Sequence, residues 1–149
     1  MAARIDTLRH SELAGAGLRG TIPSTIGDLS DLTMLDLSAN TLYSSIPNSI
    51  VRLAALETIR LSHNALNGTL PSNIGSLHLL RELSLSNNLI SGALPSSVSD
   101  LATLETCDVS FNRLESSIPS ALLQLSHLSY LYAMPPAVLV LILSFTWMF

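Results

Sequence analysis

Apolar and polar positions alternate along this chain with a fixed period. Four segments, at 32–42, 56–66, 80–90 and 104–114, share one order: apolar, two variable residues, apolar, one variable, apolar, two variable, Asn, one variable, apolar. This alternation predicts a short strand with one buried face in each segment. The asparagine that follows the strand recurs every 24 residues, as Asn40, Asn64, Asn88 and Asn112.

The second half of each unit repeats as well, because a proline follows each asparagine by seven residues. A proline ends any helix and is expected to hold the returning segment extended. Two apolar residues then bring the chain back to the core, at Ile26 and Leu29, Ile74 and Leu77, and Val98 and Leu101. A strand with one apolar face cannot bury itself, so the units are expected to stack as a solenoid of parallel strands. The prolines are Pro47, Pro71, Pro95 and Pro119.

The stretch GAGLRG, from Gly15 to Gly20, matches the G-x-G-x-x-G pattern of phosphate-binding turns. A dinucleotide site needs a helix that begins at the glycines, yet Pro23 follows Gly20 by three residues. Gly20 takes the same slot in its unit as Gly68 and Gly92. The glycines are therefore interpreted as part of the first repeat.

Each repeated asparagine lies where the chain leaves its strand and turns inward. A side-chain amide there can donate to and accept from backbone groups that the turn would otherwise leave unpaired. The four asparagines are therefore predicted to form a structural ladder and not a catalytic site.

The full unit, L-x-x-L-x-L-x-x-N-x-L-x-G-x-I-P-x-x-I-G-x-L, resembles the 24-residue unit of plant-type leucine-rich repeats, and the segment from Leu77 to Leu101 resembles a typical copy. The resemblance implies an α/β-type repeat solenoid: a right-handed curved superhelix of about six repeats, with parallel strands on its concave face. We expect a solenoid domain at 1–132 and an apolar tail at 133–149. The repeats are expected near 5–28, 29–52, 53–76, 77–100 and 101–124, with a partial one at 125–136.

The same resemblance implies a function. In this family such a solenoid is usually the extracellular part of a receptor-like kinase or receptor-like protein, and it binds a peptide, a protein or a small hormone. We therefore expect a non-catalytic recognition module with a protein or peptide ligand and a co-receptor as partners. A membrane-associated position at the cell surface follows from the family, whereas the first residues show no signal peptide and leave a cytosolic position open.

The chain also departs from the family pattern. The first unit has Ser11 and Ala16 where the pattern wants an aliphatic residue and Asn, and the last has Pro136 in the Asn slot. Ser44 and Ser116 replace glycine, which is expected to be a mild change in a loop. The cysteine-paired caps of secreted members are absent, so the chain resembles a fragment or a reduced member.

The outward-facing strand positions form columns one repeat apart, and the resemblance places ligand contacts there. Alternatively, opposite charges such as Glu57, Arg81 and Glu105 form a solvated face and pair across adjacent strands. Phe111 is expected to be an exposed contact anchor. The candidate contact residues are Asp36, Glu57, Arg60, His63, Arg81, Glu82, Glu105, Asp108 and Phe111.

Composition narrows the function further. The net charge is −4, and the seven basic residues are arginines spread singly from Arg4 to Arg113, which argues against a nucleic-acid partner. No catalytic motif occurs, and the histidines have no metal-ligand spacing with Cys107. No enzyme activity, cofactor or metal is therefore predicted. Cys107 occupies a core slot and is interpreted as a small buried hydrophobe.

The apolar tail, from Ala137 to Phe149, leaves several interpretations open. As a helix its 13 residues would reach about 20 Å, short of a hydrocarbon core of about 30 Å. It fits a short membrane anchor, a cleaved lipid-anchor signal, an apolar end left by truncation, or a helix packed over the end of the solenoid. An anchored protein whose repeats serve a structural or self-associating role is the alternative function.

One glycosylation acceptor occurs in the sequence, Asn67-Gly68-Thr69. It is expected in the turn after the strand of its repeat, where a glycan would be accessible. Its use depends on entry of the chain into the secretory pathway.

Overall fold

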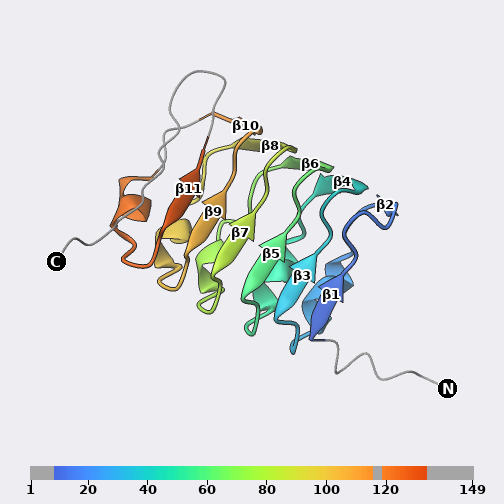
Figure 1. The fold of residues 1–149 in the computed structure, drawn as a ribbon, viewed down its shortest axis with the longest axis horizontal. Coiled ribbons are helices and arrows are strands. Elements are labelled where there is room, and N and C mark those ends of the chain that lie inside the picture. Colours follow the sequence, from blue (N-terminus) through green and yellow to red (C-terminus); the bar gives the residue numbers. More distant parts are fainter. Residues whose placement is uncertain (1–8, 116–118, 134–149) are drawn as a thin grey trace.

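The computed structural model describes residues 9–115 and 119–133. Six short strands stack side by side along the molecule in the order in which they occur in the sequence, and every neighbouring pair is parallel (Figure 1). This arrangement confirms the predicted solenoid. The strands of this first sheet are β1 (His10–Glu12), β3 (Met34–Asp36), β5 (Thr58–Arg60), β7 (Glu82–Ser84), β9 (Thr106–Asp108) and β11 (Tyr130–Tyr132).

Register in the first sheet follows the 24-residue period. Met34 pairs with Thr58 and Thr58 with Glu82, so equivalent residues of successive repeats lie side by side. The middle residue of each strand from β3 to β11 is buried, while its two neighbours are half-buried or exposed on the opposite side. A strand of three residues is enough because each one is completed by the repeat before and after it. The buried middle residues are Leu35, Ile59, Leu83, Cys107 and Leu131.

A second parallel sheet lies beside the first, and the sequence pattern did not predict it. After each repeated asparagine the chain stays extended for two to five residues and pairs with the same segment of the next repeat. Ser44 and Asn67 therefore lie in strands, and their expected positions in a loop and a turn are wrong. The strands are β2 (Arg19–Gly20), β4 (Thr41–Ser45), β6 (Ala65–Gly68), β8 (Leu89–Gly92) and β10 (Arg113–Leu114).

Short 3-10 helices follow the prolines. The proline itself is extended, as expected, but the expectation that the segment after it stays extended is wrong. Pro23 is extended, with ψ at 148°, and its carbonyl accepts a hydrogen bond from Ile26 N at 3.0 Å. Proline suits this position because the residue ahead of a first turn needs no amide donor. The helices are η2 (Ser24–Asp28), η3 (Asn48–Arg52), η4 (Ile74–Ser76), η5 (Ser96–Asp100) and η6 (Ser120–Gln124).

The apolar core lies between the strands and the 3-10 helices and runs along the described repeats as one cluster. The residues that return the chain to the core are buried in later repeats, as Ile74 and Val98 are, whereas Ile26 is only partly buried at the N-terminal end. Cys107 is fully buried, which confirms its interpretation as a small core residue. Burial raises the pKa of its thiol to about 12, and the charge of Asp108 adds to the shift.

The C-terminal tail lies outside the described residues, and so does Ser116. The interpretations of Ala137 to Phe149 as an anchor, a cleaved signal or an end cap therefore stay predictions. In the part of the chain that the structure describes, no helix is both long and apolar enough to span a bilayer.

Candidate partner-binding face

The outward side of the first sheet is a surface built by the repeat itself, and we call it the strand face. The two residues that flank the buried middle residue of each strand point outward there, because side chains alternate along a strand. One column of the strand face holds His10, Met34, Thr58, Glu82, Thr106 and Tyr130, and the other holds Glu12, Asp36, Arg60, Ser84, Asp108 and Tyr132.

Arg60, in the middle of the strand face, is held by carboxylates from both neighbouring strands. Its Nε and Nη2 donate to the two oxygens of Glu82 at 2.8 and 2.7 Å, and its Nη1 lies 3.8 Å from Asp36 Oδ2. The hydrogen bond to Glu82 raises the pKa of Arg60 above its ordinary value; burial opposes the rise, and the charges of Glu82 and Asp36 add to it. A bidentate pair of this kind fixes the guanidinium, so Arg60 is already occupied.

Arg81 joins a second set of charges at the beginning of the strands. Its Nη1 lies 2.6 Å from Glu105 Oε1, and its Nε lies 3.9 Å from Glu57 Oε2. All three side chains are about half exposed, so these pairs contribute little to stability. The alternative prediction, that Glu57, Arg81 and Glu105 pair across adjacent strands, is confirmed.

Two aspartates on the strand face share one local geometry. Asp108 Oδ1 accepts hydrogen bonds from Ser110 N at 3.0 Å and Ser110 Oγ at 2.6 Å. Asp36 Oδ1 accepts from Ser38 N and Oγ at the same two distances. In both cases the carboxylate closes the turn that follows its strand.

His63 and Phe111 occupy the first left-handed position after their strands, with φ at 57° and 52°. Ala39, in the repeat before His63, and Asn87, in the repeat between His63 and Phe111, take the same conformation, so this side chain leaves the backbone at the same edge of the strand face in all four repeats. Phe111 is 59% exposed, as expected for a contact anchor, although a contact itself stays a proposal.

Sequence reasoning missed two aromatic residues of the strand face, Tyr130 and Tyr132. Both are exposed, at 49% and 37%, and their rings stack with centroids 6.5 Å apart and planes 1° from parallel. The signal that could have found them is the period, because a step of 24 residues from Thr106 and Asp108 leads to these two positions.

The repeated asparagines lie behind the strand face and hold the backbone. Asn88 Nδ2 donates to Leu61 O and Leu85 O, both at 3.0 Å, and its Oδ1 accepts from Leu66 N at 3.0 Å. Asn40, Asn64 and Asn112 make the equivalent bonds in their own repeats. Each amide therefore joins its own turn to the repeat before it.

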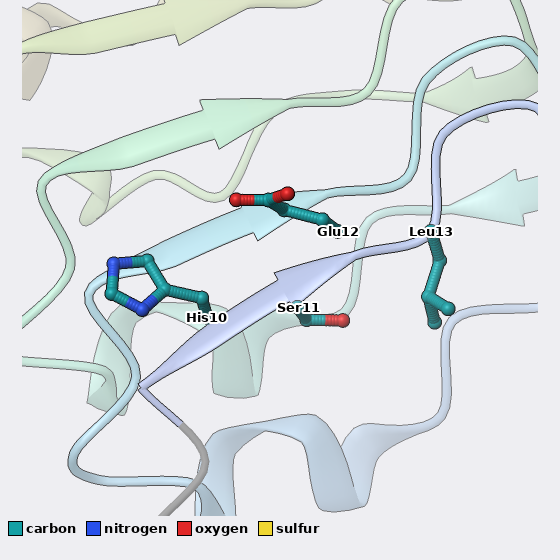
Figure 2. Close-up of a pocket in the computed structure, with 4 residues that line it drawn as sticks. All are labelled: His10, Ser11, Glu12 and Leu13. Carbon is teal, nitrogen blue, oxygen red and sulfur yellow. The ribbon is translucent and has the colours of Figure 1, made fainter.

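Among the described residues, hollows lie at the N-terminal end of the solenoid. The larger one, of about 630 Å³, is lined by four residues of and next to the edge strand β1. Figure 2 shows His10 and Glu12 on one side of that strand and Ser11 and Leu13 on the other. A smaller hollow of about 240 Å³ is lined by apolar side chains that include the exposed Leu13, the partly buried Leu18 and the buried Ile22.

These hollows do not resemble a site for a small ligand or a metal. The side chains of the larger hollow diverge from β1 and do not converge on one point (Figure 2). Within residues 9–115 and 119–133, no group of three His, Cys, Asp or Glu side chains is placed to hold a metal ion. The strand face, in contrast, presents outward side chains in register along six strands.

Comparison with known proteins agrees with this architecture. Two family models, both described as leucine rich repeat, match the chain, one at residues 12–66 and the other at 79–101 and 103–125. No curated protein sequence matches significantly.

Solved structures match most of the chain. The Arabidopsis receptor kinase HAESA, in complex with the peptide hormone IDA and the co-receptor SERK1, is 35% identical with a TM-score of 0.80, over 87% of this chain and 22% of the matched one. A chain of the BIR3–SERK2 complex from Arabidopsis thaliana is 35% identical with a TM-score of 0.73, and the match covers 82% of this chain and 64% of that one. The ectodomain of the receptor kinase SOBIR1 from the same plant is 34% identical with a TM-score of 0.73, and the match covers 85% of this chain and 65% of that one. The chain therefore spans less than two thirds of the length of each.

Proposed function

Because the chain belongs to the leucine-rich repeat family, we propose that it is a non-catalytic recognition module whose strand face binds a protein or peptide partner. The observation that carries the proposal is the strand face itself, where six parallel strands present two columns of outward side chains in one register. A periodic face of this kind offers an extended partner equivalent contacts at each repeat.

The relatives support the class of partner. The HAESA structure contains a peptide hormone and a co-receptor, and the BIR3–SERK2 structure is a complex of two proteins. For this chain we propose the same two classes, an extended peptide and a co-receptor ectodomain, as partners.

In this proposal the paired charges in the middle of the strand face orient the partner. Arg60 and Arg81 are engaged by four carboxylates of the chain, so they offer a partner no free cation, and the two arginines with their carboxylates carry a net negative charge. Such pairs set orientation and register more than affinity. The contact candidates Asp36, Glu57, Glu82 and Glu105 belong to the same charge pairs.

Two single substitutions test the use of this face. Thr58→Arg places a long cation in the centre of the strand face, whereas Tyr43→Arg places the same group on the second sheet, where Tyr43 is 55% exposed. The wild-type chain and both variants are presented to a panel of purified plant peptide hormones and leucine-rich repeat ectodomains. We expect Thr58→Arg to weaken binding by about tenfold or more, while Tyr43→Arg changes it less than about twofold. The reverse ranking contradicts the choice of face.

The proposal also places the repeats in the secretory lumen or outside the cell, and Asn67 provides the readout. Its side chain is exposed in β6, and Thr69 is exposed as well, so the acceptor is accessible on the second sheet, away from the strand face. Expressed in plant cells, the full chain should show an endoglycosidase-sensitive mobility shift that Asn67→Gln abolishes. Absence of a shift from a well-expressed chain argues for a cytosolic position.

A further inference from the structure

The C-terminal end of the strand face differs in chemistry from its middle. Tyr130 and Tyr132 present a stacked, exposed aromatic pair there, and both rings project from the outward side of β11. Exposed tyrosines carry much of the binding energy in protein interfaces. The face of an aromatic ring also attracts cations, and the planar guanidinium of arginine stacks on it.

A carboxylate lies directly beside this aromatic pair. Asp108 is the register partner of Tyr132, and the two hydrogen bonds from Ser110 both reach its Oδ1. Among residues 9–115 and 119–133 no salt bridge or side-chain hydrogen bond reaches Asp108 Oδ2. This carboxylate is half-buried, which strengthens its attraction for a cation relative to a fully solvated one.

The chain itself shows which group fits such a carboxylate. Asp36 makes the same two bonds to its serine, and one repeat further on its register partner is Arg60, whose Nη1 lies 3.8 Å from Asp36 Oδ2. At Asp108 the position one repeat further on is Tyr132. Beside Asp36 the next repeat supplies an arginine, whereas beside Asp108 it supplies an aromatic side chain.

The other carboxylates nearby are already compensated. Glu105 pairs with Arg81, and Glu82 pairs with Arg60. From β3 to β11, Asp108 is the carboxylate of the strand face for which the described residues supply no cation. A partner would have to bring one.

We infer that this end of the strand face binds an arginine side chain of an extended peptide. The guanidinium donates to Asp108 Oδ2 and stacks on the exposed tyrosine pair, with Phe111 as an apolar contact at the same edge. This inference rests on the proposed function, because it names the chemistry that one end of the strand face recognises. It also predicts that binding is specific for arginine and not for positive charge in general, since a planar guanidinium can stack and donate together.

The experiment uses a pair of matched peptides. Acetyl-Leu-Arg-Leu-amide and its citrulline counterpart, acetyl-Leu-citrulline-Leu-amide, are titrated separately into the ¹⁵N-labelled full-length chain and followed by NMR. Citrulline keeps the shape and planarity of arginine and removes its charge. We expect shifts centred on the amides of 105–111 and 130–133, with the arginine peptide bound about tenfold more tightly than the citrulline peptide. Equal affinity for the two peptides overturns the inference.

A matched pair of variants locates the site. Asp108→Asn and Asp36→Asn each keep an oxygen that can accept from the serine of the turn, so both should preserve the backbone. We expect Asp108→Asn to lower the affinity for the arginine peptide by about tenfold and Asp36→Asn to change that affinity by less than about twofold. Tyr132→Ser should weaken it as well, through loss of the stacking surface. Equal losses in the two Asn variants, or shifts centred elsewhere, overturn the inference.

These outcomes are separate from those of the proposed function. Thr58→Arg changes the middle of the strand face and tests whether partners use it at all. Each aspartate variant removes one charge, in β9 or in β3, so the arginine site can fail while the strand face remains the partner surface. Conversely, a Thr58→Arg variant without effect on partners that the chain binds contradicts the proposed function, whatever the short peptides do.

Discussion

At the scale of single residues, the repeat demands particular backbone conformations as well as particular side chains. Gly68 and Gly92 end their strands in the second sheet with φ at 72° and 74°, a region that costs other residues free energy. Ser44 has the same φ, 72°, and the structure places it inside β4. Its replacement of glycine is therefore a strained position and not the mild loop change that the sequence indicated.

The strain at Ser44 gives a stability prediction. Ser44→Gly should stabilise the chain by about 0.5–1 kcal/mol, because relief of the left-handed strain outweighs the extra entropy of the unfolded glycine. Urea unfolding followed by circular dichroism measures the change. Ser45→Gly, one residue further on where φ is not positive, serves as the control and should destabilise the chain. Stabilisation by both substitutions would contradict the argument.

Cys107 provides a pH-dependent prediction at the same scale. The pKa of its buried thiol is about 12, against 9.0 for an ordinary thiol, so between these values the folded state binds more protons than the unfolded state. The free energy of unfolding should therefore fall as pH rises through this window, and this contribution should be absent below it. At pH 9 we expect iodoacetamide to modify the folded chain at least about 100-fold more slowly than the urea-unfolded chain. Comparable rates would mean that Cys107 is accessible in the folded state.

At the scale of elements, the close approach of neighbouring 3-10 helices depends on glycine. A Cβ atom on Gly75 would collide with the carbonyl oxygen of Ser97 in η5, and one on Gly27 would collide with the carbonyl oxygen of Ser49 in η3. The η4–η5 contact is tight enough for Gly75 N to donate to Ser97 Oγ at 3.4 Å. In the sequence Gly75 is one position of the I-G-x-L motif, and the structure shows that glycine is needed there because η5 lies too close for a Cβ atom.

This contact predicts the effect of one added methyl group. Gly75→Ala should destabilise the chain by about 1–3 kcal/mol, because the backbone of η5 must move away from η4. The matched control is Ser99→Ala, in the same slot of the next repeat, where only an exposed hydrogen bond to Ser96 O is lost. We expect the control to change the free energy of unfolding by less than about 0.5 kcal/mol in urea titrations. Similar losses at the two sites would rule out the close approach as the cause.

At the scale of the whole molecule, the asparagine ladder links the repeats in series. Asn88 belongs to one repeat, yet its amide bonds to Leu61 O and Leu66 N, which belong to the repeat before it. In an array where each unit contacts only its neighbours, such links set the coupling between units. The ladder therefore holds the strand face in register over the length of the solenoid.

Removal of one amide tests this coupling. Asn88→Ala removes the partner of Leu66 N, Leu61 O and Leu85 O. The loss should lower the free energy of unfolding by about 2–4 kcal/mol. Asn48→Ala, at an exposed position in η3 for which the structure gives no side-chain hydrogen bond, should change stability by less than about 0.5 kcal/mol. Urea unfolding of the two variants measures both values. A small loss at Asn88 would show that the turns hold without their amides.

The sequence by itself determined the parts of this protein that depend on period. The 24-residue spacing of Asn40, Asn64, Asn88 and Asn112 is enough for the stack of parallel strands, since equivalent residues of identical units must lie side by side. It also determined the columns of the strand face, and it offered the pairing of Glu57, Arg81 and Glu105 as one interpretation, because charges one repeat apart become neighbours.

Only the tertiary structure decided the features that arise between repeats. The second sheet forms because segments such as β4 and β6 find partners one repeat away, and the 3-10 helices lie against those of neighbouring repeats, as the contact of Gly75 with Ser97 shows. The stacking of Tyr130 on Tyr132, and the Asp108 carboxylate left beside them without a cation, likewise depend on distances between atoms of adjacent units. A linear pattern fixes which residues face each other, whereas the close contacts that decide their chemistry exist only once the units are stacked.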